Sequence, residues 1–255
     1  MTKTDVLLQH LVEDAGFRSE SAAREYCRTL YPGIDPKGRR ILEVGCGDGA
    51  IGLYGACEGA EHVVGLEPEA AGAYGENLAA FRRAVAKCGL TNAEAFPVTL
   101  QEFDPGAERF DLVLMRAVVN HLDEEACIEL KESPEARARY GEIFRNLAGI
   151  MSPGARLVLT DGSRHSFWNL LHLRNPFAPT IEYHKHQSPR VWIALLRQAG
   201  FAGEKVDWLV PRALRPLGPL AANEAVGGFT WSKCRLGMRK SGRGKARWRA
   251  GGPAR

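Results

Sequence analysis

The sequence predicts an α/β fold in which a mostly parallel β-sheet carries helices on both faces. Apolar, strand-like runs alternate with helical segments over the first 160 residues, and this alternation is typical of parallel sheets. A chain of 255 residues is long enough for one large α/β domain or two small ones. Its 45% hydrophobic and 25% charged residues indicate a globular protein rather than a disordered one.

The chain begins with two predicted helices. Apolar residues of 5–15 fall on one helical face, and a second helix is expected from a Ser19 cap to about Leu30. Two prolines and a glycine between 32 and 36 then break the chain. Residues 1–36 are therefore predicted to form an N-terminal helical cap.

The remaining elements define a main domain over residues 37–240. Five strands are predicted at 40–44, 62–66, 94–98, 111–115 and 156–160. Helices between them include one that ends at Cys88 before Gly89, and a longer helical region over 123–150 that ends at Pro153-Gly154. A helix at about 189–199 and two final strands near 204–210 and 228–237 complete the expected order.

The net charge of +4 is unevenly distributed. Nine basic residues and no acid lie between Lys233 and the end, which leaves 25 basic against 30 acidic residues in 1–232, a net of −5. Residues 241–255 are predicted to be a basic, disordered tail. Because the body is acidic, a nucleic acid or another acidic partner is expected only through this tail.

Other signals exclude several protein classes. No run of about 18 apolar residues exists and the N-terminus lacks a signal-peptide pattern, so neither a membrane span nor secretion is expected. The six cysteines show no metal-ligand spacing and are expected to be reduced. The sequence thus predicts a cytoplasmic protein without a bound metal.

The strongest functional signal is a glycine-rich turn after the first predicted strand. It reads Gly45-Cys-Gly47-Asp-Gly49-Ala50, with a helix expected after it. Glycines permit a tight turn and the close approach of a ligand to the backbone. Glu67 ends the next strand, 20 residues after Gly47, where a carboxylate can accept both ribose hydroxyls of a nucleoside.

Two cofactor classes fit this pattern, a dinucleotide and S-adenosylmethionine. Glu43 precedes the turn and Asp48 lies within it. Two carboxylates repel a pyrophosphate, whereas they suit a ligand with a cationic amino group and a sulfonium. The charges therefore favour S-adenosylmethionine.

With these motifs in place, the sequence resembles class I S-adenosylmethionine-dependent methyltransferases over about 38–161, and more loosely to 237. ILEVGCGDG is similar to the first family motif, Leu66-Glu67-Pro68 to the second, and 110–122 to the fourth strand with its loop. The stretch 147–161 is similar to the helix, Pro-Gly and strand motif. The resemblance implies a doubly wound, Rossmann-like sheet of seven strands, mostly parallel with an antiparallel last strand.

The resemblance also implies a set of donor-binding residues. They are Glu43, Gly45, Cys46, Gly47, Asp48, Glu67, Pro68, Gln101, Glu102 and Arg116. In such enzymes Glu43 and the backbone at 45–47 would border the methionine part, and Glu67 would hold the ribose. Gln101 and Glu102 would lie near the adenine, although Leu100 stands where the family often has a polar adenine contact.

The segment at about 162–188 is the predicted acceptor-pocket insertion. It holds four of the seven histidines, and it includes the aromatic residues Phe167, Trp168, Phe177 and Tyr183 as candidate pocket walls. His184 and His186 alternate, so in an extended segment both would project the same way. Together with His121 they are the candidate catalytic bases, and the alternative is that these histidines pack, cap or face water.

The acceptor is predicted to be a small molecule or biosynthetic intermediate, methylated at oxygen or nitrogen. The sequence lacks an Asn/Asp-Pro-Pro-Tyr segment and a Pro-Cys or Thr-Cys nucleophile context, and its acidic body offers no phosphate-tracking face. It resembles the broad small-molecule type of methyltransferase. The alternatives are an oxidoreductase with a nucleotide cofactor, a catalytically silent binding protein, and an RNA methyltransferase that uses the basic tail.

Overall fold

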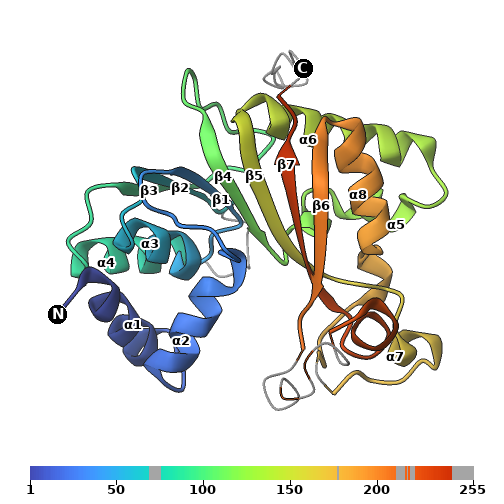
Figure 1. The fold of residues 1–255 in the computed structure, drawn as a ribbon, viewed down its shortest axis with the longest axis horizontal. Helices are drawn as coiled ribbons and strands as arrows, with labels where there is room; N and C mark the ends of the chain where they lie inside the picture. The colour runs from blue at the N-terminus through green and yellow to red at the C-terminus, as the bar shows by residue number, and fades with distance from the viewer. Residues whose placement is uncertain (69–75, 177, 211–215, 217, 219–221, 243–255) are drawn as a thin grey trace. The chain divides into compact units, whose positions relative to one another are not determined.

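The computed structural model describes residues 1–68, 76–176, 178–210, 216, 218 and 222–242 (Figure 1). The described residues divide into two compact units. Unit 1 contains Met1–Arg116 and Ile150–Leu157, and unit 2 contains Ala117–Gly149 and the described part of 158–242. Phe177 and most of the predicted tail lie outside the described residues.

The strands form a seven-stranded sheet. They are β1 (Arg40–Val44), β2 (His62–Leu66), β3 (Ala93–Phe96), β4 (Phe110–Arg116), β5 (Met151–Gly162), β6 (Phe201–Trp208) and β7 (Lys233–Lys240). Their order is β3-β2-β1-β4-β5-β7-β6. β1 pairs in parallel with β2 and β4, β2 pairs in parallel with β3, and β6 and β7 are antiparallel. The predicted fold class is confirmed.

The central strands of unit 1 are short apolar runs because they are covered on both faces. Four of the five residues of β1 are buried, and β2 shows the same pattern. Leu42 lies opposite Val64 of β2 and Val113 of β4. This register places the carboxyl ends of β1, β2 and β4 at one edge, where the glycine-rich turn begins.

Four helices belong to unit 1. They are α1 (Lys3–Asp14), α2 (Glu20–Cys27), α3 (Ala50–Cys57) and α4 (Asn77–Lys87). The buried apolar face of α1 contacts α3 and α4. Ser19 caps α2 as predicted, but the α-helix ends at Cys27 and a 3-10 turn continues to Leu30. Gly89 follows α4 with a φ of +58°, in agreement with its predicted role as a helix stop.

Unit 2 contains α5 (Glu124–Glu129), α6 (Pro134–Gly149), α7 (Phe167–Leu170) and α8 (Pro189–Gln198). Its core is built on three aromatic rings, Tyr140 and Phe144 of α6 and Trp192 of α8. The Trp192 centroid lies 5.3 Å from that of Tyr140 and 6.2 Å from that of Phe144. These contacts fix α8 against α6.

Three predicted boundaries are wrong. The helical region 123–150 is two helices, because Pro134 cannot continue a helix and instead begins α6. β5 begins at Met151 and includes Pro153-Gly154, which the sequence analysis placed before the strand. The last strand begins at Lys233 because residues Glu224–Gly228 form a π-helix that Asn223 caps. Within the described residues, no helix is long and apolar enough to cross a membrane.

Candidate functional site

The glycine-rich turn connects β1 to α3 and has left-handed backbone at two critical positions. Gly49 has a φ of +83°, and a Cβ there would lie 2.3 Å from the Phe81 ring, so a side chain does not fit. Gly47 has a φ of +54°, yet a Cβ there would meet no atom within 4 Å. The backbone at Gly47 therefore borders open space rather than packed side chains.

A cavity of about 90 Å³ lies beside this turn. It is lined by Tyr26, Glu43, Gly45, Cys46, Gly47, Asp48, Ala50, Ile51 and Arg116. We call it the glycine-turn cavity. Six of its nine lining residues are among the ten predicted donor-binding residues, so the structure brings the larger part of that set together.

Glu43 is the buried acid of the glycine-turn cavity. Its side-chain Oε2 accepts a hydrogen bond of 2.7 Å from the Gly52 amide, and the residue is only 2% exposed. Burial raises the pKa of Glu43 to about 8, the Gly52 amide opposes this shift, and Asp48 adds to it by repulsion. At neutral pH the carboxyl group is therefore mostly protonated until a cation offsets the cost of its charge.

Arg116 and Tyr26 also line the glycine-turn cavity. The Arg116 guanidinium lies 4.1 Å from the centroid of the Tyr26 ring, in a cation–π contact. Burial raises the pKa of the Tyr26 hydroxyl, and the Arg116 charge opposes that rise. The sequence analysis selected Arg116 but missed Tyr26, because a tyrosine on an amphipathic helix carries no motif.

Glu67 lies next to the turn, at the end of β2. Its Oε2 accepts a 2.8 Å hydrogen bond from the Gly47 amide, and its Oε1 accepts one of 2.9 Å from the Asn77 side chain. The carboxylate is therefore held at the turn in a defined orientation. Pro68 follows it and is exposed.

Gln101 and Glu102 are not among the residues that line this cavity. Both are exposed. The Glu102 carboxylate accepts hydrogen bonds from the amide and the hydroxyl of Thr99, and these bonds lower its pKa. In the structure the Glu102 side chain thus caps the turn that begins at Thr99.

His186 has the most organised surroundings of the three candidate bases. Its Nδ1 lies 2.9 Å from Oδ1 of Asp161, whose side chain is completely buried. The other oxygen of Asp161 accepts a 3.1 Å hydrogen bond from the indole N–H of Trp192. An imidazole bound in this way to a carboxylate has its orientation and tautomer fixed.

The other two candidate histidines differ from His186. Tyr183–Lys185 is a 3-10 helix, so the condition of an extended segment is not met. His184 is exposed, while His186 faces Asp161. His121 is also exposed, and its Nδ1 lies 2.5 Å from the Glu124 carboxylate.

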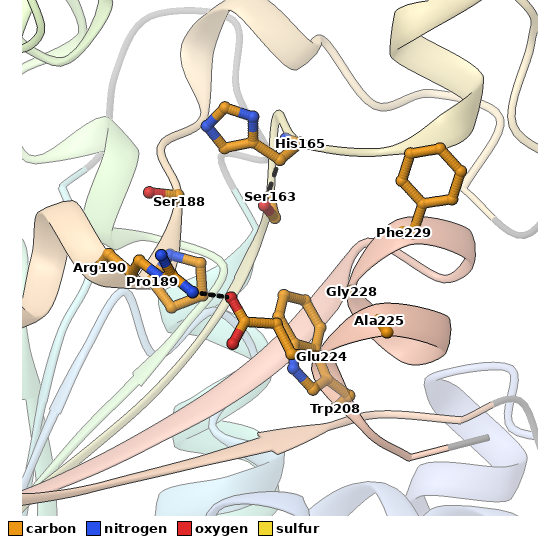
Figure 2. A pocket seen from close by; sticks show the side chains of 10 residues that line it. All are labelled: Ser163, His165, Ser188, Pro189, Arg190, Trp208, Glu224, Ala225, Gly228 and Phe229. Carbon is orange, nitrogen blue, oxygen red and sulfur yellow. Dashed lines mark hydrogen bonds and ion pairs between the residues drawn. The ribbon is translucent and has the colours of Figure 1, made fainter. Parts of the chain in front are cut away.

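A larger cavity, of about 390 Å³, lies in unit 2 (Figure 2). It is lined by Ser163, His165, Ser188, Pro189, Arg190, Trp208, Glu224, Ala225, Gly228 and Phe229. We call it the Trp208 cavity. The sequence analysis missed Trp208 and Phe229, which lie in segments far from 162–188.

The predicted aromatic wall takes a different form in the structure. Phe167 packs edge-on against both Trp168 and Phe229, so it supports a cavity residue rather than lining the cavity itself. The Tyr183 hydroxyl accepts a 2.9 Å hydrogen bond from Asn175. Among the described residues, no group of three or more His, Cys, Asp or Glu side chains could hold a metal ion.

Comparison with protein families identifies the chain. A family model described as a methyltransferase domain matches residues 8–206, more than three quarters of the sequence. The chain belongs to this methyltransferase family. The match includes the glycine-rich turn, Glu67 and the histidine-rich segment. A comparison with curated proteins gave no match.

Solved structures agree with the methyltransferase fold. An S-adenosylmethionine-dependent methyltransferase from Mesorhizobium loti is 20% identical over 86% of this chain and 99% of its own, with a TM-score of 0.57. The magnesium protoporphyrin IX methyltransferase of Synechocystis, solved with S-adenosylmethionine bound, is 14% identical over 87% and 79%, with a TM-score of 0.52. The cyclase SpnF is 18% identical over 90% and 84%, with a TM-score of 0.57. The predicted resemblance to class I methyltransferases is confirmed, and the cyclase shows that one fold serves several chemistries.

Proposed function

We propose that this methyltransferase uses S-adenosylmethionine and methylates an oxygen or nitrogen of a small molecule. The observation that carries the proposal is the glycine-turn cavity, in which a buried carboxyl group and a second acid lie beside open backbone. A cationic amino group would add to the charge of Arg116 and so stabilise the ionised form of the buried Glu43. Solved methyltransferases of the same fold, one with the cofactor bound, support the choice of ligand.

The residues present fit this cofactor. Gly47 has no atoms within 4 Å of an added Cβ, so the backbone there can approach a ligand closely. The Gly47 amide orients the Glu67 carboxylate at the same turn. The remaining lone pairs of this carboxylate can accept hydrogen bonds from the ribose hydroxyls. Arg116 lines the same cavity in contact with the Tyr26 ring, and its guanidinium can meet the ligand carboxylate.

When bound, S-adenosylmethionine supplies a methyl group. The acceptor atom bonds to the methyl carbon as the carbon–sulfur bond breaks, and the electron pair of that bond goes to the sulfur. The protein has to hold the acceptor in line and accept a proton if the nucleophile carries one. We assign the base to His186, because Asp161 holds its Nδ1 and leaves Nε2 as the proton acceptor. Asp161 is then a positioning residue.

Calorimetry with S-adenosylhomocysteine and NAD⁺ tests the cofactor. We expect binding of the former alone, and a Gly47→Leu variant should lose at least about 100-fold in affinity because its side chain fills the cavity. Gly106→Leu is the matched control, since Gly106 is an exposed glycine of unit 1 with a φ of +57° and no atom within 4 Å of an added Cβ. Unchanged affinity in Gly47→Leu would overturn this placement.

The rival functions give different results in the same set of measurements. Binding of NAD⁺ without S-adenosylhomocysteine identifies an oxidoreductase. Binding of S-adenosylhomocysteine without transfer of labelled methyl to any fraction of cell metabolites identifies a catalytically silent binding protein. Labelling of RNA alone identifies a nucleic-acid methyltransferase. The predicted cytoplasmic location and the predicted domain boundaries at 36 and 240 stay predictions.

A further inference from the structure

The Trp208 cavity combines an aromatic, buried interior with a charged mouth. Trp208, Ser163 and Pro189 are buried, whereas Arg190 and Glu224 are well exposed. Its volume of about 390 Å³ lies in the range of small-molecule sites, which is about 300–1,000 Å³. The cavity is therefore large enough for a ligand with one or two rings.

The indole of Trp208 forms a firm apolar wall. Its ring packs directly on the backbone of Gly228, where a Cβ would lie 2.8 Å from the nearest ring atom. Phe229 follows and also lines the cavity. It is 43% exposed, and the centroid of its ring lies 5.8 Å from that of Phe167. Two rings fixed by their own neighbours favour a flat ligand, because aromatic pairs gain from stacked and edge-on contacts.

Three cationic side chains act on the His165 wall of the Trp208 cavity. Burial lowers the pKa of His165, and the charges of Lys131, Arg164 and Arg190 lower it further, so all three cations act on this wall. Arg190 is the second residue of α8, and no acid lies in the first turn of that helix. A group with negative charge is thus stabilised here.

The cavity also offers hydroxyl donors for such a group. The Ser163 hydroxyl accepts a hydrogen bond from the His165 amide, which leaves its own hydrogen to donate. Glu224 is the one acid among the described lining residues, and it forms an ion pair of 2.9 Å with Arg190 (Figure 2). In this ion pair, Glu224 neutralises part of the positive charge of Arg190 at the mouth of the cavity.

We propose that the Trp208 cavity binds an aromatic acid, with its ring against Trp208 and Phe229 and its anionic oxygen toward Ser163 and Arg190. The inference goes beyond the proposed function, since it assigns a ligand class to a cavity of unit 2 that shares no lining residue with the glycine-turn cavity. It is also separable from that function, because binding of the acid and binding of the cofactor involve different cavities and different residues.

Calorimetric titration with three probes tests the ligand class. Benzoate has both the ring and the charge, benzamide keeps the ring without the charge, and cyclohexanecarboxylate keeps the charge without the aromatic ring. We expect benzoate to bind at least about tenfold more tightly than either, as a charge-assisted hydrogen bond and an aromatic contact each permit. Equal affinity for benzamide, or the absence of saturable benzoate binding at millimolar concentrations, would overturn the proposal.

Variants of the ion pair at the mouth give effects of opposite sign. Arg190→Gln removes the cation and leaves Glu224 unpaired, so benzoate affinity should fall about tenfold. Glu224→Gln frees Arg190, so affinity should rise about threefold. Arg197→Gln, at the other end of the same helix, is the matched control and should leave affinity unchanged. Equal effects at 190 and 197 would contradict the assignment.

The cofactor titration separates the two ideas. Phe229→Leu should weaken benzoate binding severalfold and leave affinity for S-adenosylhomocysteine as in the natural chain. Benzoate binding in a protein that does not bind S-adenosylhomocysteine overturns the proposed function and supports the cavity assignment. Binding of S-adenosylhomocysteine without benzoate does the reverse.

Discussion

The two cavities differ in how deeply their charged side chains are buried. The glycine-turn cavity of unit 1 is small and polar, and its central acid is buried at a cost that raises the Glu43 pKa. The Trp208 cavity of unit 2 is larger and aromatic, and its charges stand at an exposed ion pair. The glycine-turn cavity is suited to one cationic ligand. The ligand preference of the Trp208 cavity can be altered by substitution of the exposed residues at its mouth. The predictions below test this contrast.

The largest effect is expected from Glu43→Gln on the pH dependence of stability. Since the folded-state pKa is raised to about 8, the folded protein holds a proton that the unfolded chain releases above about pH 4.5. Stability should therefore fall as pH rises from about 4.5 to 8, by up to about 5 kcal/mol. Thermal unfolding at a series of pH values should show this slope in the natural chain and a flatter one in Glu43→Gln.

Glu94→Gln provides the control for that experiment. Glu94 lies on β3 of the same unit, and its side chain is half-exposed. Its variant should keep the slope of the natural chain. If Glu43→Gln and Glu94→Gln unfold with parallel pH dependence, the buried acid is not the source of the linkage.

The next effect concerns the base. His186→Ala should lower kcat for an acceptor that carries a proton by about 100-fold or more, with little change in KM. Asp161→Asn should lower kcat less and alter the His186 tautomer, because it removes the carboxylate that holds Nδ1. Long-range ¹⁵N NMR of the His186 ring reports its tautomer. If Asp161 had only a structural role, the Asp161→Asn variant would keep the tautomer of the natural chain.

The exposed His172, on the same segment, supplies the control for the base. His172→Asn suits its left-handed backbone and should retain normal kcat. A carboxylate acceptor, which is already an anion, should depend on His186 far less than a phenol or an amine does. Equal losses for all acceptors would indicate that His186 supports the fold rather than the proton transfer.

Gly228→Ala should produce a smaller effect, confined to unit 2. The added Cβ would lie 2.8 Å from the Trp208 ring, and such overpacking costs about 1–3 kcal/mol. Benzoate affinity should fall severalfold while that for S-adenosylhomocysteine stays constant. Gly237→Ala, whose Cβ meets no atom within 4 Å, should change neither. A loss of cofactor affinity in Gly228→Ala would break the separation of the two cavities.

The smallest effect is expected from removing residues 243–255. They contain five of the nine basic residues after position 232. Methyl transfer to a small acceptor should stay within about twofold, and only salt-sensitive binding to RNA should weaken. A large loss of transfer to the small acceptor would show that the tail takes part in the reaction and is not an accessory.

The sequence predicted the parts of the molecule that depend on local pattern. The strands β1 and β2 match the predicted bounds, and the glycine-rich turn and Glu67 meet as expected, because a strand, a turn and a helix fix each other's geometry over a few residues. Predictions for segments without such a local pattern were less accurate. The pair at 184 and 186 alternates in sequence, but the 3-10 helix sends the two rings to different surroundings.

Other site residues could not be found from local pattern at all. Asp161 follows the fifth predicted strand and carries no motif of its own, and its bonds to His186 and Trp192 join positions 25 and 31 residues apart in the chain. Trp208 and Phe229 reach their cavity through the antiparallel strands and the π-helix that precedes β7. Such contacts depend on tertiary packing, which composition and spacing do not encode.

The contact between Tyr26 and Arg116 has a consequence for synthesis of the protein. The two residues are far apart in sequence, and the later one lies at the end of β4. A nascent chain that has emerged as far as Glu67 already carries the glycine-rich turn and both of its acids, but it lacks Arg116, which lines the cavity with them. The cofactor pocket is thus completed only after β4 has paired with β1, so a ribosome-bound intermediate of unit 1 should be unable to capture its ligand prematurely.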